Sequence, residues 1–197
     1  MRDDAKSRDQ LGKSQQCDLY THFIQKFGSE DKRTFQEARE NFIRSLAPYA
    51  VVSYILQIKD RHNGNILINN KGHLIHIDFG FIFEISPAGN MKFERAEFKL
   101  TSEMIRIIGG SRTSEPFQNF VNLTIRAFLA VRKYGEHLYN MIALMHESAL
   151  DCFRPDSLKN LRERFVLNKN DLDAAKYMAE KIDHAYNNMN TYLYDEI

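Results

Sequence analysis

The chain has 197 residues, of which 43% are hydrophobic and 27% charged, a composition that suits one globular domain or one lobe of a larger domain and disfavours intrinsic disorder. Its 27 Lys and Arg against 26 Asp and Glu give a formal net charge of +1. Because dedicated nucleic-acid-binding domains are usually strongly basic, no nucleic-acid partner is predicted. No apolar run approaches the roughly 20 residues of a membrane span, and the first ten residues lack the apolar core of a secretory signal. The two cysteines are too few for a disulfide framework or a zinc site, and they fit a reducing cytosolic setting.

The first half of the chain predicts one long helix followed by a hairpin and a loop. Capping-box spacing at Thr34 and Glu37 precedes apolar residues at mostly helical intervals, which predicts a helix over about 35–57. The segment 66–79 is rich in isoleucine and is interrupted by an Asn-Asn-Lys-Gly tetrapeptide, which is typical of a β-hairpin. Residues 81–99 show no clear period, and a loop of this length in a compact domain is usually functional.

Helical periodicity returns after this loop. Ser114 and Pro116 suit the start of a helix that ends near Gly135, and a second helix is expected over 138–149. A last amphipathic helix is expected over 172–186. The Phe, Tyr and Met residues of these stripes are expected to form core rather than a cofactor site. The predicted fold class is therefore mainly α with a small β-hairpin.

The isoleucines of the hairpin predict its register. A two-residue turn at Lys71-Gly72 places four isoleucines on one buried face, and a one-residue shift would send half of them to the other face. The predicted pairs are Ile66 with Ile77 and Ile68 with Ile75. The same register sets Asn65 directly across from Asp78, with Cβ atoms roughly 5 Å apart. An amide oxygen and a carboxylate at this distance suit Mg²⁺.

Asp60 adds a third polar residue, because it lies five residues before Asn65 in the loop that enters the hairpin. This spacing matches the catalytic apparatus of protein kinases, in which a metal-binding Asn follows the catalytic Asp by five residues and a second metal-binding Asp opens Asp-Phe-Gly. Hard oxygen ligands hold Mg²⁺ on the phosphates, and a positioned base accepts the proton of the attacking hydroxyl. Asp60, Asn65 and Asp78 together therefore predict phosphoryl transfer.

The order of the catalytic triplet indicates a particular superfamily. Protein kinases read His-Arg-Asp, whereas this chain reads Asp60-Arg61-His62, which resembles the phosphatidylinositol 3-/4-kinase superfamily. Three segments are similar to type III phosphatidylinositol 4-kinases: QIKDRHNGNI at 57–66, GHLIHIDFGFIFEISPAGN at 72–90 and FKLT at 98–101. Lys59 supports this similarity, because the 3-kinases and the related protein kinases usually have glycine there. Three others are most similar to the alpha form: SRDQLG at 7–12, ENFIRSLAPYA at 40–50 and AFLAVRKY at 127–134.

The resemblance implies a role for each motif residue. Asp60, Arg61 and His62 would be the catalytic residues: either Asp60 or His62 activates the lipid hydroxyl, His62 also steadies the transferring phosphate, and Arg61 acts in catalysis or as a structural anchor. The implied cofactors are ATP and Mg²⁺, with Mn²⁺ as an alternative metal. The implied cofactor-binding residues are Asn65, Asp78, Phe79 and Gly80, of which Asn65 and Asp78 are the metal ligands.

The loop at 81–99 would be the activation loop, which in this superfamily contacts the lipid headgroup. Lys92, Arg95 and Lys99 are the implied substrate residues. The charges of the loop cancel, and they belong to Glu84, Lys92, Glu94, Arg95, Glu97 and Lys99. A substrate that already carries several ring phosphates would favour a clustered basic loop, so this balance suits phosphatidylinositol itself.

The resemblance also implies how the chain is organised. It shows no Gly-rich phosphate loop and no strand lysine followed by a helix glutamate, which this family carries in an N-terminal lobe. Residues 1–197 are therefore expected to be the C-terminal lobe of the catalytic domain, with the N-lobe absent. Its expected parts are the catalytic loop at 59–65, Asp-Phe-Gly at 78–80, the activation loop at about 81–99 and C-terminal helices over about 101–197.

The predicted function is ATP-dependent phosphorylation of the 4-hydroxyl of phosphatidylinositol, with the chain alone inactive. The implied partners are phosphatidylinositol at a membrane surface, the missing N-lobe, the upstream helical region of the parent kinase and scaffold proteins. The implied location is cytoplasmic and peripheral at membranes, the plasma membrane in particular. Two alternatives stay open. One is a related protein kinase of the same superfamily, which Lys59 and residues 81–99 disfavour; the other is an inactive helical fragment that acts as an interaction module.

Overall fold

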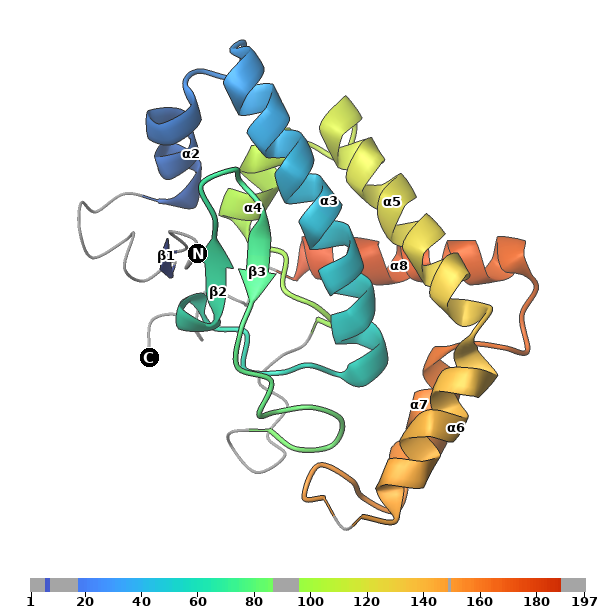
Figure 1. The fold of residues 1–197 in the computed structure, drawn as a ribbon. Coiled ribbons are helices and arrows are strands. Elements are labelled where there is room, and N and C mark those ends of the chain that lie inside the picture. Colours follow the sequence, from blue (N-terminus) through green and yellow to red (C-terminus); the bar gives the residue numbers. More distant parts are fainter. Residues whose placement is uncertain (1–5, 8–17, 87–95, 149, 189–197) are drawn as a thin grey trace.

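The computed structural model describes residues 6–7, 18–86, 96–148 and 150–188. Helices make up most of this part, and three short strands form one small sheet (Figure 1), which confirms the predicted fold class. The elements in chain order are β1 Lys6–Ser7, α2 Leu19–Phe27, α3 Arg33–Leu56, η1 Asn63–Asn65, β2 Ile66–Ile68, β3 Leu74–His76, α4 Ser102–Ile107, α5 Glu115–Arg132, α6 Gly135–His146, α7 Ser157–Arg164 and α8 Asp171–Asn187.

Helix α3 is the central element, with the hairpin on one side and α5 on the other (Figure 1). It confirms the helix predicted over about 35–57. The predicted capping box at Thr34 is wrong, because the N-cap position is Lys32, which makes no side-chain capping bond. Thr34 lies inside the first turn and donates its hydroxyl to the carbonyl of Phe27 at the end of α2. It therefore satisfies a carbonyl that the end of α2 leaves without a helical partner.

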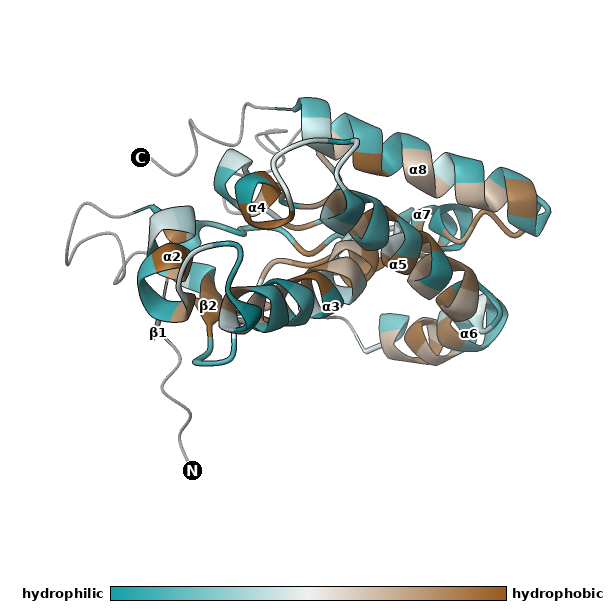
Figure 2. Cartoon of the chain, turned by 90° about the horizontal axis from the view of Figure 1, so that it is seen from above, coloured by the Kyte–Doolittle hydropathy of each residue, from teal (hydrophilic) through white to brown (hydrophobic). Residues whose placement is uncertain are grey.

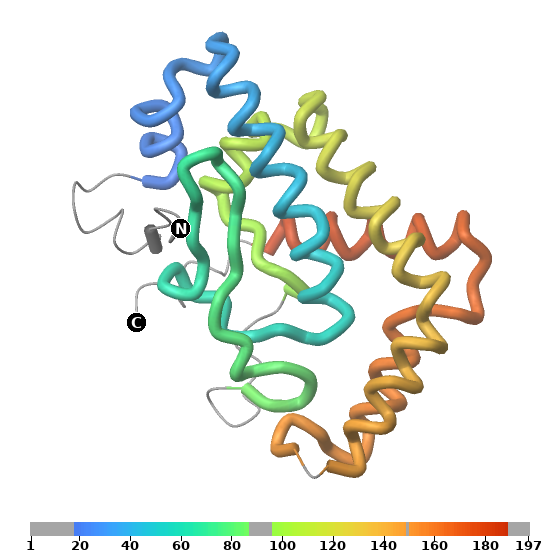
Figure 3. The backbone as a smooth tube through the Cα atoms, in the orientation of Figure 1, coloured from blue at the N-terminus to red at the C-terminus, as the bar shows by residue number. Residues whose placement is uncertain are grey.

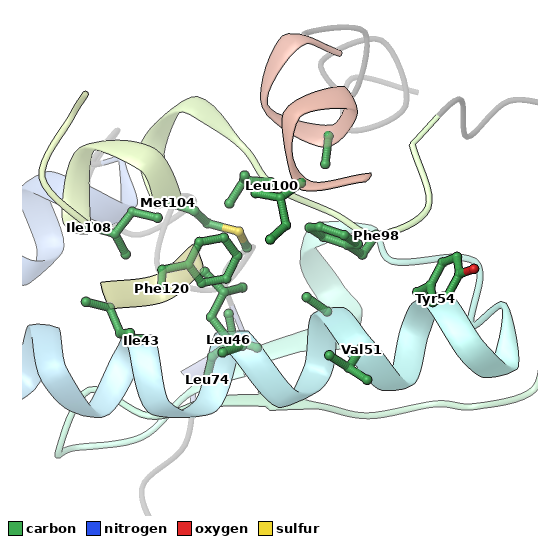
Figure 4. Packing of buried hydrophobic residues seen from close by; sticks show 14 of the residues in the cluster. Ile43, Leu46, Val51, Tyr54, Leu74, Phe98, Leu100, Met104, Ile108 and Phe120 are labelled. Carbon is green, nitrogen blue, oxygen red and sulfur yellow. The ribbon is translucent and has the colours of Figure 1, made fainter. Parts of the chain in front are cut away.

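The helices share one hydrophobic core, as the sequence predicted for its apolar stripes. Figure 4 shows Phe120 of α5 lying among Ile43 and Leu46 of α3 and Met104 of α4. Phenylalanine rings fill much of this space and meet edge to face; the rings of Phe23 and Phe42, for example, lie 5.5 Å apart at 85°. Such contacts add to the free energy gained by burying the rings.

The hairpin forms where it was predicted, but in a different register. The pairs are Ile66 with His76, Leu67 with Ile75 and Ile68 with Leu74, and β1 extends the sheet by pairing with β2. Ile66, Ile68, Leu74 and His76 are buried, whereas Ile77 is 38% exposed, so the prediction of four isoleucines on one face is wrong. Figure 3 shows the chain turning between the two strands.

The turn explains this one-residue shift. Three residues, Asn70 to Gly72, separate the paired Asn69 and His73, and the amide of Asn69 donates to the carbonyl of His73 over 3.0 Å. Gly72 has a φ of +89°. A Cβ there would lie 2.7 Å from the carbonyl oxygen of Ala38, so α3 and the turn can approach only because this residue is glycine. A three-residue turn ending in a left-handed glycine is a common hairpin connection, and it sets the observed register.

The C-terminal helices follow the predicted order. Ser114 caps α5 by accepting a hydrogen bond from the amide of Phe117, as its position predicted. Gly135 begins α6, and α8 confirms the predicted last helix. Figure 2 shows apolar residues on α6, where Met141 and Leu144 are exposed. Among the residues that the structure describes, no helix has both the length and the apolar character needed to cross a membrane.

Candidate active site

The catalytic-loop residues lie in the connection between α3 and the hairpin. Helix α3 ends at Leu56, and the chain then runs to the short helix η1 without regular structure. Asp60 has a φ of +60°, a conformation that non-glycine residues seldom adopt. The side-chain nitrogen of Asn65 donates to the carbonyl of Asp60 over 2.9 Å and lies 3.4 Å from its carboxylate. The structure thus brings together the two residues that the five-residue spacing predicted to cooperate.

His62 lies beside the same carboxylate. Its Nε2 is 3.9 Å from Oδ2 of Asp60, and its side chain is 40% exposed. Its Nδ1 accepts a hydrogen bond of 3.0 Å from the amide of Gly64. An Nδ1 that accepts carries no proton, so in the neutral ring the proton is on Nε2, on the side of Asp60.

The guanidinium of Arg61 is buried against backbone carbonyl groups. Arg61 is only 3% exposed. Its guanidinium donates to the carbonyl of Lys59 over 2.9 Å, to that of Ile77 over 2.8 Å and to that of Asp78. These bonds tie the catalytic loop to the end of the hairpin, so the contacts of Arg61 are those of a structural anchor. A direct catalytic role for this residue stays a prediction.

The residue opposite Asn65 in the hairpin is Ile77, one position before the predicted partner Asp78. The amide of Ile77, not a group of Asp78, donates to the carbonyl of Asn65 over 3.0 Å, so the predicted pairing of Asn65 with Asp78 directly across the strands is wrong. The three-residue turn described above is the cause. Strand alternation ends at Asp78, whose φ is +56°. Arg61 is therefore what ties Asp78 to the catalytic loop.

The side-chain chemistry of Asn65 and Asp78 fits a magnesium ion bound together with phosphates. Because the nitrogen of Asn65 is used by Asp60, its oxygen is the atom offered to a metal. One carboxylate oxygen of Asp78 accepts from the amide of Gly80 over 3.2 Å, which leaves the second oxygen for a ligand. Across the described ranges, no cluster of three or more His, Cys, Asp or Glu could hold a metal without help. Mg²⁺ is commonly bound by one or two protein ligands together with substrate phosphates, which matches this donor set.

A buried histidine ends strand β3. His76 is 7% exposed and stacks on Tyr49 with 4.2 Å between the ring centroids. Burial, together with the positive charges of Arg61 and Lys99, lowers the pKa of His76 to about 3. Its Nδ1 is buried without a hydrogen-bond partner. This neutral ring is packed on the buried face of the hairpin with Ile66 and Ile68, which is the face that the predicted register gave to Ile75.

Lys59 holds the segment that follows Asp-Phe-Gly. Its backbone amide donates to the carbonyl of Phe81 over 2.8 Å. Its ammonium group donates to the carbonyls of Phe83 and, over 3.2 Å, of Ile85. Sequence reasoning used this lysine only as a subfamily marker and missed its structural role, since nothing in the local sequence signals a contact 24 residues away.

Of the three predicted substrate residues, the structure describes Lys99. Lys92 and Arg95 lie outside the described residues. Lys99 donates from its ammonium group to the side-chain oxygen of Asn63 in η1 over 3.2 Å. Lys99 therefore lies next to the catalytic loop, and its contact with a substrate stays a prediction.

Two acidic residues of the predicted activation loop bind helices instead. Glu84 accepts from the side chain of Asn160 over 3.1 Å. Glu97 accepts from Lys181 over 2.6 Å and from His184 over 3.0 Å. Burial favours the neutral acid, but the bonds from Lys181 and His184 outweigh it and hold the pKa of Glu97 below its ordinary value. Glu84 and Glu97 are therefore bonded to α7 and α8, and a count of the charges in the loop does not show these separate contacts.

The assembled loop has the order and spacing of a kinase catalytic loop, with Asp60 bonded to Asn65 and with Arg61, which follows Asp60, bonded to the carbonyl of Asp78 in Asp-Phe-Gly. The family model for phosphatidylinositol 3- and 4-kinases matches residues 2–154, and the chain belongs to this family. That range contains every residue assigned above to the candidate site.

Relatives at high identity are phosphatidylinositol 4-kinases. The chain is 48% identical over 191 residues to phosphatidylinositol 4-kinase stt4 of Schizosaccharomyces pombe, which covers 96% of this chain and 10% of the relative. It is 44% identical over 195 residues to phosphatidylinositol 4-kinase alpha 2 of Arabidopsis thaliana, covering 98% of this chain and 37% of the relative. Identity to phosphatidylinositol 4-kinase beta of Xenopus tropicalis is 39% over 188 residues, covering 94% of this chain and 23% of the relative. The chain thus spans between a tenth and somewhat more than a third of these relatives, and the higher identities belong to the first two.

Proposed function

We propose that this chain is the C-terminal lobe of a phosphatidylinositol 4-kinase, which transfers the γ-phosphate of ATP to the 4-hydroxyl of phosphatidylinositol. The observation that carries the proposal is that Asn65 donates to Asp60, while Arg61, which follows Asp60 in the chain, donates to the carbonyl of Asp78. The relatives named as phosphatidylinositol 4-kinases support the substrate class and the position of the hydroxyl. The nucleotide also needs a second wall, which the proposal assigns to an N-lobe.

Within this proposal Asp60, His62, Asn65 and Asp78 have separate roles, which their contacts support. Asp60 accepts the proton of the attacking hydroxyl, because the tautomer of His62 places a proton on Nε2 and leaves that atom unable to accept one. His62 instead donates toward the transferring phosphate. Asn65 and Asp78 bind the metal through one oxygen each. When bound, Mg²⁺ neutralises charge on the phosphates of ATP, and Mn²⁺ has the same ligand preference.

The remaining parts of the proposal concern the surroundings of the lobe. Phe79 and Gly80 lie beside the nucleotide, and Lys92, Arg95 and Lys99 lie beside the lipid headgroup. The parent protein acts on the cytoplasmic side, peripherally at a membrane and at the plasma membrane in particular. Its other partners are the upstream helical region and scaffold proteins, with no nucleic acid among them.

The test compares the complete gene product with the 197-residue chain, using phosphatidylinositol vesicles, ATP and Mg²⁺. We expect 4-phosphorylated product from the complete protein and none from the chain alone, because catalysis by positioning needs both walls of the cleft. Asp78→Asn should abolish turnover, and Asp183→Asn, at an exposed ion pair on α8, should not. A product phosphorylated at another hydroxyl would overturn the assignment. Phosphorylation of a peptide instead of the lipid would favour the related protein kinases, and complete inactivity would favour an interaction module.

A further inference from the structure

The stretch that follows Asp-Phe-Gly, residues 81–86, is bonded directly to both sides of the catalytic-loop entrance. The amide of Phe83 donates to the carbonyl of Leu56 over 2.8 Å, and the amide of Lys59 donates to the carbonyl of Phe81 over 2.8 Å. Lys59 immediately precedes Asp60. Any displacement of residues 81–86 therefore moves the backbone that carries the proposed base.

Phe83 needs an external support to stay where it is. Its φ is +52°, a left-handed conformation that costs a non-glycine residue roughly 1 kcal/mol or more. Its ring is only 4% exposed and stacks on the ring of Phe153, with 5.3 Å between centroids and 26° between planes. The ring of Phe153 also packs on His146, at 5.2 Å. Phe153 thus lies between the end of α6 and the stretch 81–86.

The support comes from a region distant in the sequence and outside the catalytic motifs. Phe153 belongs to the connection between α6 and α7, which spans residues 147–156. Next to this stack, Asn160 of α7 donates to Glu84 over 3.1 Å. Phe83 and Glu84 are therefore held by Phe153 and Asn160. Both of these residues belong to the helical hairpin that α6 and α7 form with their connection.

We propose that Phe153 is a positioning residue for phosphoryl transfer. Its ring holds Phe83 in the left-handed conformation and, through the backbone bonds of Phe83 and Lys59, keeps Asp60 in place relative to Asp78. The inference rests on the proposed function, because it assigns Phe153 to the geometry of that same site. Phe153 does not touch the reacting groups, and Asn160 provides a second, weaker contact of the same kind.

The first experiment measures kinetics in the complete gene product. Phe153→Leu keeps an apolar side chain but removes the planar stack, and we expect kcat to fall about tenfold with the KM for ATP within about twofold, since small displacements of a catalytic group lower the rate more than they weaken binding. Phe153→Tyr keeps the ring and should retain most of the activity. The matched control is Tyr139→Leu, which removes a half-buried ring of the same helical hairpin that packs on Arg162 at 5.5 Å. This control should leave kcat unchanged.

The second experiment uses hydrogen exchange on the 197-residue chain and does not depend on activity. In Phe153→Leu, peptides that contain the amides of Lys59 and Phe83 should exchange faster than in the wild type, and in Tyr139→Leu they should not. Absence of 4-phosphate product from the wild-type protein would refute the proposed function, while the exchange result would still test the support by Phe153. An active wild type in which Phe153→Leu and Tyr139→Leu have equal kcat would overturn the positioning role. Unchanged exchange at Lys59 and Phe83 in Phe153→Leu would show that Phe153 does not support the backbone hydrogen bonds of these two residues.

Discussion

The two described ends of the predicted activation loop are attached to the rest of the molecule by different interactions. The first end, residues 81–86, is held by backbone hydrogen bonds, by the ammonium group of Lys59 on two carbonyls and by an aromatic stack. The second end, residues 96–100, buries Phe98 and Leu100 in the core, and its polar contacts are ion pairs from Glu97 to α8 and the hydrogen bond from Lys99 to Asn63. Partly exposed ion pairs weaken with salt and with protonation, whereas packing and backbone bonds do not.

This difference lies in the polar contacts, because the polar contacts of the first end use neutral carbonyl groups and those of Glu97 at the second end pair opposite charges. The first end follows Asp-Phe-Gly directly and is bonded to Lys59, the residue before Asp60. The second end contacts the catalytic loop through Lys99 and continues to α4, and only its ion pairs from Glu97 to α8 are expected to respond to the ionic surroundings. Four measurements of unfolding in the 197-residue chain test this contrast.

The largest expected effect is at Arg61, which holds the chain just before the first end, at Ile77 and Asp78. Arg61→Met removes bonds to the carbonyls of Lys59, Ile77 and Asp78 and leaves these groups without their donor. At roughly 1 kcal/mol or more for each, the free energy of unfolding should fall by about 3 kcal/mol. Urea denaturation measures this change. The control is Arg33→Met, at an ion pair whose arginine side chain is 91% exposed, where the change should stay below about 0.5 kcal/mol. A loss below about 1 kcal/mol for Arg61→Met would show that the loop does not depend on this residue.

A smaller effect is expected at Lys59. Lys59→Met removes the bonds from the ammonium group to the carbonyls of Phe83 and Ile85, and the free energy of unfolding should fall by about 2 kcal/mol, since hydrogen bonds to charged groups contribute about 1.5–3 kcal/mol. The difference from the wild type should be nearly the same in low and high salt, because the partners are neutral carbonyls next to the charge. A difference that disappears in 1 M salt would place this end in the same class as the second one.

A third effect, smaller again, is expected at the second end. Glu97→Gln removes the carboxylate that binds Lys181 and His184, whose side chains are 26% and 53% exposed. The free energy of unfolding should fall by about 1 kcal/mol at low ionic strength, and the loss should shrink as salt is added. Glu37→Gln, at an exposed helical pair, is the matched control and should change little. A Glu97→Gln effect as large as that of Lys59→Met and insensitive to salt would remove the contrast between the ends.

The sequence predicted the parts of the site that are local and failed where distant contacts decide. Helix α3 followed from its periodicity, and the nearness of Asp60 to Asn65 followed from their five-residue spacing. The hairpin register was wrong by one residue, because the turn is fixed by the contact of Gly72 with Ala38 on another element. Isoleucine pairing alone could not show that Leu74 supplies the apolar partner of Ile68.

The supports of the site were also out of reach of sequence reasoning. Phe83 and Phe153 are 70 residues apart and have no motif of their own, so each is indistinguishable in sequence from a core phenylalanine. The sequence places Glu97 in a charge-balanced loop, and only the fold shows that Lys181 and His184 lie beside it. The motif therefore identified the reacting groups, while the groups that hold them came from the packing of helices distant in the sequence.

The smallest and most specific effect is the pH dependence of the second end. The pKa of Glu97 is lower in the folded chain than its ordinary value of 4.5, so the unfolded state binds this proton more tightly than the folded state does. The stability that Glu97 contributes is then fully present above pH 4.5 and is lost as the pH falls through its lower, folded pKa. Urea denaturation of the wild type and of Glu97→Gln should therefore give a difference that is present at about pH 5 and shrinks as the pH falls below about 4.5. The corresponding difference for Lys59→Met serves as the control and should stay level over the same range, because the carbonyls of Phe83 and Ile85 are neutral groups. A Glu97→Gln difference that stays level down to pH 3 would show that the carboxylate does not hold this end through its charge.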